Sequence, residues 1–249
     1  MPKSVDLPAS AAQRQELSCT NVIPAIQYME SQCGAAETSR VVESLGLPLA
    51  FLQSKSNWVS YDYFNELLSA MVEATGDEKA PYKAPLSIKP QEVFEYALYA
   101  TQALLWYGGL RLPYRLILGS DLYRRWTKIG RFEILSSTSR SIEVEMRLDG
   151  GYKQTKNNCY AIQGMLAAIP IGVGLPAAQV TETRCAVDGH EGCVYEVRWR
   201  NPKRSGAHLA LPGFALIAVL QLTVFRGLFD AGHVVVTGLV FLALGLLAK

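Results

Sequence analysis

Three cysteines and a glutamate in the second half of the sequence have the types and spacing of ligands to one metal ion. They are Cys159, Glu182, Cys185 and Cys193. Thiolates together with a carboxylate suit zinc, a borderline-soft ion that takes four ligands in a tetrahedron. A closed shell of four protein ligands leaves no position for a reacting water. These residues therefore predict a structural zinc ion as the cofactor.

Two features leave this ligand set open. Glu182 and Cys185 are three positions apart, so in an ideal strand they point to opposite faces unless a bulge intervenes. His190, in the turn before Cys193, is a rival to Glu182 as the fourth ligand. Because no compact C-x-x-C zinc motif is present, the alternative interpretation is three buried thiols in a sheet core without a metal.

The hydrophobic pattern predicts the elements that position these ligands. Alternating apolar residues in RFEILSS and SIEVEMRLD predict a hairpin. Strands over 179–187 and 193–200 follow, joined by the turn DGHEG, and a helix over 156–168 carries Cys159. Helices that precede the strands indicate an α+β fold with a C-terminal antiparallel sheet and a zinc-clamped hairpin. These earlier helices are predicted over residues 22–32, 38–45, 60–75, 90–107 and 120–128.

The composition excludes several functional classes. A net charge of +2 over 249 residues gives no basic surface for nucleic acid. The start MPKSVDLPAS has no apolar run, so no secretory signal is expected and the five cysteines are predicted to be reduced. A dinucleotide fingerprint and a Ser/His/Asp set are both absent from the sequence, which favours a protein that is not an enzyme.

The end of the chain is far more apolar than the rest. Two uncharged runs flank the segment 226–233, and each is long enough to cross a bilayer core, so two transmembrane helices are predicted. Buried core helices are the alternative. Basic residues before the first run (Arg198, Arg200, Lys203 and Arg204) predict an inner-membrane protein whose preceding domain is cytoplasmic. The predicted domains are an irregular N-terminus over 1–20, a sensor domain over 21–200, a linker over 201–207 and the membrane helices over 208–249.

The segment NNCYAIQGMLAAIPIGVGLPAAQVTETRCAVDGHEGCVYEVRWR, residues 157–200, resembles the end of a 4-vinyl reductase domain. This family is similar to the sensory domains of bacterial activators for aromatic compounds. The resemblance implies zinc ligands at the same three cysteines and Glu182. The segment NWVSYDYFNELLSAMVEATGD is similar to the start of bacterial input domains that end in this module. Together they imply an input domain of a bacterial signal transduction protein.

The resemblance also implies a ligand pocket between the helices and the sheet, and hence a membrane-tethered sensor for a hydrophobic or aromatic small molecule. Such a sensor is expected to form a homodimer. An enzyme or accessory protein for tetrapyrrole vinyl reduction and a homodimeric scaffold module are the alternatives. Core packing is the alternative role for each predicted lining residue. The predicted lining residues are Trp58, Phe94, Leu98, Trp106, Tyr107, Trp126 and Phe132.

The histidines depart from the family pattern. Aromatic sensors have a pocket histidine ahead of the zinc cysteine, whereas this chain has only His190, His208 and His233, all of which follow Cys159. The same absence argues against a haem–nitric oxide domain with a proximal histidine. Such a haem domain is also expected to have a different fold.

Overall fold

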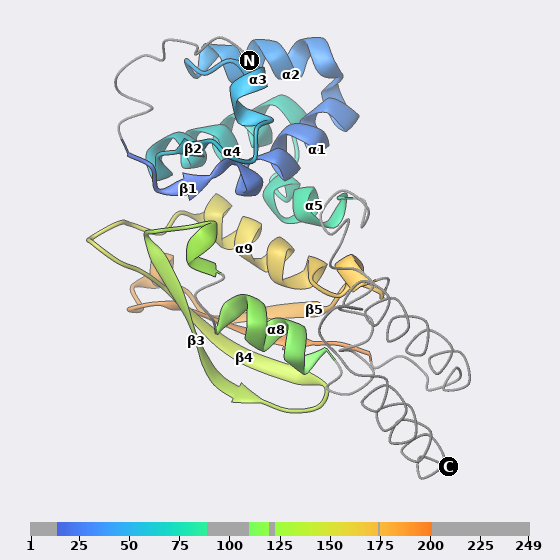
Figure 1. Cartoon of the computed structure of the whole chain (residues 1–249), viewed down its shortest axis with the longest axis vertical. Coiled ribbons are helices and arrows are strands. Elements are labelled where there is room, and N and C mark those ends of the chain that lie inside the picture. The colour runs from blue at the N-terminus through green and yellow to red at the C-terminus, as the bar shows by residue number, and fades with distance from the viewer. Residues whose placement is uncertain (1–13, 89–109, 120–122, 174, 201–249) are drawn as a thin grey trace, which may run out of the picture. The chain divides into compact units, whose positions relative to one another are not determined.

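The computed structural model describes residues 14–88, 110–119, 123–173 and 175–200. They lie in one compact unit, Met1–Asn201, which has helices in its first half and a four-stranded antiparallel sheet in its second (Figure 1). The predicted α+β class and the antiparallel sheet are therefore confirmed. The predicted domain boundaries stay a prediction.

The first half is a layer of helices around an apolar core. Its longest helix, α4, is capped as the sequence predicts: Ser60 Oγ accepts a hydrogen bond from Tyr63 N, and Gly76 ends the helix with a φ of 63°. A two-residue antiparallel pair, β1 with β2, closes one side of this layer. The elements are β1 (Leu17–Ser18), η1 (Cys19–Asn21), α1 (Ile23–Cys33), α2 (Ala35–Ser44), α3 (Leu49–Leu52), β2 (Trp58–Val59), α4 (Tyr61–Thr75) and α5 (Ala80–Leu86).

The second half is an antiparallel sheet in the order β3-β4-β6-β5. Alternate residues of its central strands point to one face and are buried there, as Ile142, Val144 and Tyr195 illustrate. Helices α8 and α9 pack on that face and complete a second core. The elements are α8 (Arg111–Leu118), η2 (Tyr123–Arg125), β3 (Gly130–Ser137), β4 (Ser141–Leu148), α9 (Lys156–Ala168), η3 (Ile171–Val173), β5 (Gln179–Arg184), η4 (Ala186–Asp188) and β6 (Cys193–Arg198).

Helix α9 joins the two halves, because it packs on α5 on one side and on β5 and β6 on the other. Thr155 caps its start by accepting a hydrogen bond from Asn158 N. At Gly164 the backbones approach so closely that a Cβ atom would lie 2.2 Å from the carbonyl oxygen of Tyr82. The contact between α9 and α5 therefore requires glycine at this position.

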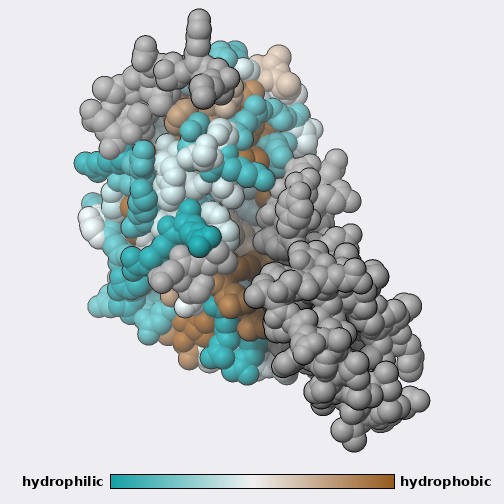
Figure 2. Space-filling view, in the orientation of Figure 1, coloured by the Kyte–Doolittle hydropathy of each residue, from teal (hydrophilic) through white to brown (hydrophobic). Residues whose placement is uncertain are grey.

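Several predicted elements differ from the structure. The strand predicted over 179–187 ends earlier, at Arg184. The described part of the helix predicted over 120–128 contains only the single turn η2. Helix α8 was not predicted. The helix predicted over 90–107 lies outside the described residues. Large apolar side chains that stay exposed in the described ranges are few (Leu116, Leu135 and Val187), and the face in Figure 2 is largely hydrophilic with smaller hydrophobic areas.

The predicted membrane localisation is corrected. Within residues 14–88, 110–119, 123–173 and 175–200, no helix is both long and apolar enough to cross a bilayer. The segment 208–249, on which the two predicted transmembrane helices rest, lies outside the described residues.

Candidate functional site

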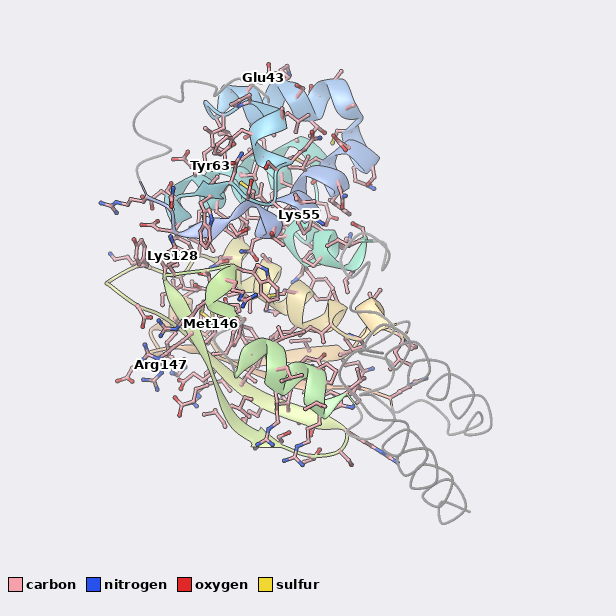
Figure 3. The ribbon with its side chains drawn as sticks, viewed as in Figure 1. Glu43, Lys55, Tyr63, Lys128, Met146 and Arg147 are labelled. Atoms are coloured by element: carbon pink, nitrogen blue, oxygen red, sulfur yellow. The ribbon has the colours of Figure 1, made fainter. Side chains whose placement is uncertain are left out.

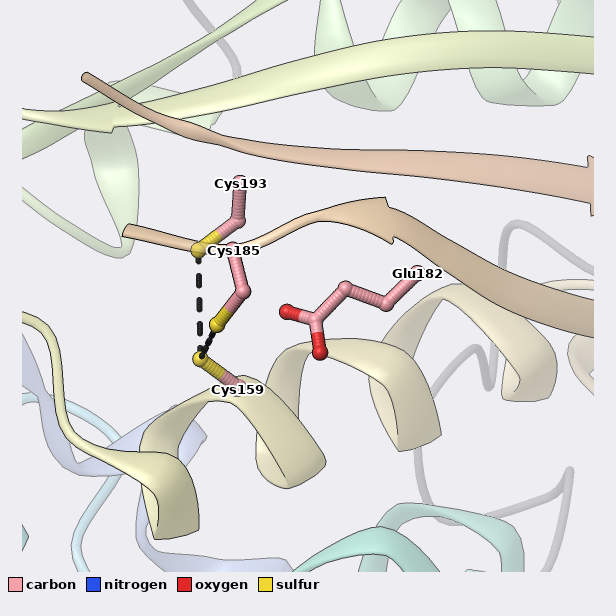
Figure 4. A group of neighbouring side chains, drawn as sticks. All are labelled: Cys159, Glu182, Cys185 and Cys193. Carbon is pink, nitrogen blue, oxygen red and sulfur yellow. Dashed lines mark hydrogen bonds between the residues drawn. The ribbon is translucent and has the colours of Figure 1, made fainter. Parts of the chain in front are cut away.

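The predicted metal ligands meet at one point between α9 and the last hairpin. One ligand atom from each of the four residues lies within 4.8 Å of all the others. Cys159 comes from the first turn of α9, Cys193 from the start of β6, and Glu182 from β5, and Figure 4 shows their side chains converging with Cys185. Three different elements thus contribute to one cluster, which we call the thiol cluster.

A β-bulge brings the side chains of Glu182 and Cys185 to the same side of β5. The pairing of β5 with β6 shifts register between Glu182 and Arg184, and the strand then gives way to the turn η4. Cys185, the residue before η4, therefore points to the same side as Glu182. The sequence required an irregularity here for the two side chains to meet, and the structure contains one.

The three thiols are buried and in contact. Cys159 Sγ lies 3.6 Å from Cys185 Sγ and 3.8 Å from Cys193 Sγ. A hydrogen bond with Cys159, assisted by one from Ala186 N, lowers the pKa of Cys193 to about 6 despite burial. The hydrogen bond with Cys193, together with burial, raises the pKa of Cys159. Of these two cysteines, Cys193 is thus the one that loses its proton more readily, and the thiolate is the form that binds metals.

Glu182 is held in position by neighbours on α9. Its Oε2 atom accepts hydrogen bonds from Lys156 Nζ and Gln163 Nε2, each at 3.3 Å. Its Oε1 atom is buried and has no hydrogen-bond partner among the described residues. One carboxylate oxygen is thus fixed by the protein, and the other remains available to a cation beside the thiols. His190 lies exposed in the turn and is not one of the four clustered residues.

A cavity of about 930 Å³ lies between the helical layer and the sheet half. Most of its described lining is apolar, including Phe64 on α4, Ile162 on α9 and Met146 on β4. Polar side chains such as Gln53 and Lys55 contribute from the helical half. Figure 3 labels Lys55 in that half and Met146 on the sheet.

Of the seven residues predicted to line the pocket, one lines the cavity, two do not, and four lie outside the described residues. Trp126 lines the cavity. Trp58 and Phe132 are not among the lining residues: Lys128 Nζ lies 4.3 Å from the centre of the Trp58 ring, and Phe132 packs edge-on against Tyr123 in the sheet core. The other four predicted residues, Phe94, Leu98, Trp106 and Tyr107, lie outside the described residues.

Sequence reasoning missed three buried polar residues in the cavity wall, Tyr61, Thr127 and Asn158. Asn158 directly precedes Cys159, so an α-helix turns the two side chains toward different sides of α9. The signal that could have identified Asn158 is its position in the first turn of the predicted helix, directly before Cys159. Since Cys159 faces the thiol cluster, its neighbour must face another side of the helix.

No known family model matches the sequence, and no curated protein matches it. An α+β domain with a cavity between its helices and its sheet is nevertheless a known architecture. A solved oxygen-binding H-NOX domain related to soluble guanylate cyclases, in its oxygen complex, is 15% identical, with a TM-score of 0.50 over 75% of this chain and 96% of that one.

A second solved H-NOX domain, from work on haem distortion in that family, is 14% identical, with a TM-score of 0.50 over 75% of this chain and 97% of that one. An Fe(II) unliganded H-NOX protein from K. algicida is 10% identical, with a TM-score of 0.47 over 76% and 98%. At the two scores of 0.50, the described chain has the fold of H-NOX domains.

This result corrects three predictions. The resemblance to 4-vinyl reductase domains is wrong, since no family matches and the structural neighbours are H-NOX domains. The expectation that a haem–nitric oxide domain has a different fold is wrong for the same reason. Structural zinc as the cofactor is also corrected by this comparison, because a solved domain of this fold is described with haem.

The described cavity wall does not fit a haem held by histidine. Haem iron in proteins is bound by His, Cys, Met or Tyr side chains. The described lining contains neither histidine nor cysteine, and its candidate donors are tyrosines and methionines. Of these, Tyr61 already makes hydrogen bonds through its hydroxyl. The chain thus has the fold of H-NOX domains without a histidine among the described residues that line its cavity.

Proposed function

We propose that this chain is a small-molecule sensor domain and that the cavity between its helices and its sheet binds an apolar ligand directly. The observation that carries this proposal is the cavity itself. Its volume of about 930 Å³ lies within the range of small-molecule sites, and an apolar wall with a few polar groups is typical of them. The H-NOX fold supports the proposal, since one such domain binds oxygen and is related to guanylate cyclases.

A fluorescent apolar probe tests this proposal. 1-Anilinonaphthalene-8-sulfonate is expected to bind the wild-type chain saturably at one site. Ala161→Trp places a large ring in the cavity wall and is expected to abolish that binding, whereas Ala36→Trp, at an exposed position of α2, is expected to leave it unchanged. Equal binding by the wild type and Ala161→Trp, or no saturable binding by the wild type, contradicts the proposal.

We also propose that the thiol cluster binds a thiophilic metal ion, which ties the last hairpin to α9. Three buried thiols and a carboxylate support this function, since one ligand atom from each lies within 4.8 Å of the others and one carboxylate oxygen has no hydrogen-bond partner among the described residues. The alternative of buried thiols without a metal gives no reason for a carboxylate to be held against them. Elemental analysis of the purified chain identifies the ion.

Cobalt(II) is the probe for this second proposal, because thiolate ligands give it an intense charge-transfer band. One equivalent of Co²⁺ is expected to produce this band and to raise the thermal midpoint. Absence of the band at one equivalent in the reduced protein contradicts the proposal. The predicted homodimer is tested separately by sedimentation, and no observation favours the enzyme or scaffold alternative.

A further inference from the structure

Three buried polar side chains interrupt the apolar wall of the cavity: Thr127, which precedes β3, and Tyr61 and Asn158, which bond each other and form a pair. Tyr61 at the start of α4 is 3% exposed, and Asn158 in the first turn of α9 is 5% exposed. Both line the cavity, beside the apolar residues Phe64 and Ile162. Because buried polar groups are costly unless they form hydrogen bonds, the partners of this pair determine what else it can bind.

The donors of the pair are already used. Asn158 Nδ2 donates to the Tyr61 hydroxyl at 3.0 Å and to Gln154 Oε1 at 3.1 Å, which occupies both amide protons. The single hydroxyl proton of Tyr61 is donated to the carbonyl oxygen of Lys153 at 3.1 Å. Neither residue therefore has a proton left to offer a ligand.

What remains of the pair is acceptor capacity. Asn158 Oδ1 has no hydrogen-bond partner within the part of the chain that the structure describes, and the Tyr61 oxygen keeps one lone pair. The elements that carry and face the pair, α4, α9 and β4, contribute no carboxylate to the described lining; the carboxylate that does line the cavity, Glu30, lies on α1, and the cation Lys55 lines the cavity as well. A cationic donor bound at the pair would therefore lose its hydration without a counter-charge on the elements that hold the pair, which favours a neutral donor.

We infer that Tyr61 and Asn158 form a polar subsite that accepts a hydrogen bond from a neutral hydroxyl group, so that the ligand class is apolar alcohols. This inference rests on the proposed sensor function, since it assigns the ligand of the same cavity. It also gives a reason for the buried asparagine in a wall that is mostly apolar.

Two isomers test the inference, since they differ in whether the oxygen carries a proton. 1-Nonanol has a hydroxyl group, whereas 1-methoxyoctane has the same atoms without a donor. Each is titrated against 1-anilinonaphthalene-8-sulfonate bound to the full chain. The wild type is expected to prefer 1-nonanol by about fivefold, the value of one net hydrogen bond.

Three variants test whether the preference for 1-nonanol depends on Tyr61 and Asn158. Asn158→Leu keeps the side-chain volume and removes the acceptor, so the preference is expected to fall to about one. Tyr61→Phe is the second variant and is expected to reduce the preference. Asn157→Leu, the neighbour on α9 that bonds Ser69 and does not line the cavity, is expected to keep the full preference.

The outcomes separate the two proposals. Equal affinity of the wild type for both isomers, or a preference that survives in both Asn158→Leu and Tyr61→Phe, overturns the polar subsite while the cavity remains a ligand site. Failure of the wild type to bind the fluorescent probe or either isomer overturns the sensor function, and the subsite with it.

Discussion

Glu182 is oriented before any ion binds, because Lys156 and Gln163 fix one of its two oxygens from α9. A ligand that is already in position loses little conformational entropy on binding, so its contribution to affinity is large. The thiols alone offer three ligands, and the fourth decides whether the shell closes.

Glu182→Gln is therefore expected to weaken Co²⁺ binding by at least about tenfold, because the amide keeps the shape but loses the charge. Glu196→Gln is the matched control, since Glu196 lies on β6 and pairs with Arg198. Titrations followed by the charge-transfer band measure both affinities. Equal affinities for Glu182→Gln and the wild type exclude Glu182 from the ligand shell.

Cys19 gives a pH dependence that does not involve the thiol cluster. Burial raises the pKa of its thiol from 9.0 to about 12. The unfolded chain thus loses this proton near pH 9 and the folded chain only near pH 12. The stabilisation from the neutral thiol is fully present below pH 9 and is lost as the pH rises through 12.

Between pH 9 and pH 12 the free energy of unfolding of the wild type is expected to fall more steeply than that of Cys19→Ala, by up to about 1.4 kcal/mol per pH unit. Urea denaturation at several pH values measures the difference. Cys33→Ala, on α1, is the control and is expected to follow the wild type. Parallel curves for the wild type and Cys19→Ala contradict the prediction.

At the scale of elements, α9 is the one that both proposed sites share. It carries Cys159 of the thiol cluster, and Asn158 and Ile162 of the cavity wall. Its distance from α5 is set by Gly164, where the carbonyl of Tyr82 occupies the space of a side chain. A change that moves α9 should therefore disturb the two sites together.

Gly164→Ala tests this role of α9. In an exposed helix this substitution stabilises by about 1 kcal/mol. Here the added methyl group meets backbone that cannot rotate away, so we expect a loss of about 1–3 kcal/mol in the free energy of unfolding and weaker probe binding. Chemical denaturation measures the first and fluorescence titration the second. A gain in stability shows that α5 can move away at little cost.

Local signals explain which elements could be predicted from the sequence. Ser60 and Gly76 bound α4, and the alternation in β4 fixes its buried face, because these effects act between near neighbours. Helix α8 was missed because Pro113 lies in its first turn, where the missing N–H costs nothing. The cavity could not be predicted, since its wall joins segments as distant as Thr20 and Ile171.

At the scale of the whole molecule, the fold and the cavity lining point to different ligands. A solved domain of this fold is described with haem. The three histidines of this chain are His190, which is exposed in the β5–β6 turn, and His208 and His233, which lie outside the described residues. A fold can keep its architecture while its site changes, so the lining decides the ligand.

The purified chain is therefore expected to contain far less than one haem per protein, even when the growth medium supplies a haem precursor. Without histidine in the described cavity wall, haem iron lacks the axial ligand that most often holds it, and the polar pair of Tyr61 and Asn158 is committed to other bonds. Pyridine haemochrome analysis against protein concentration measures the ratio, with myoglobin prepared in parallel as the positive control. A ratio near one haem per chain, with a sharp Soret band that Ala161→Trp abolishes, shows that the cavity holds haem and overturns direct binding of an apolar ligand.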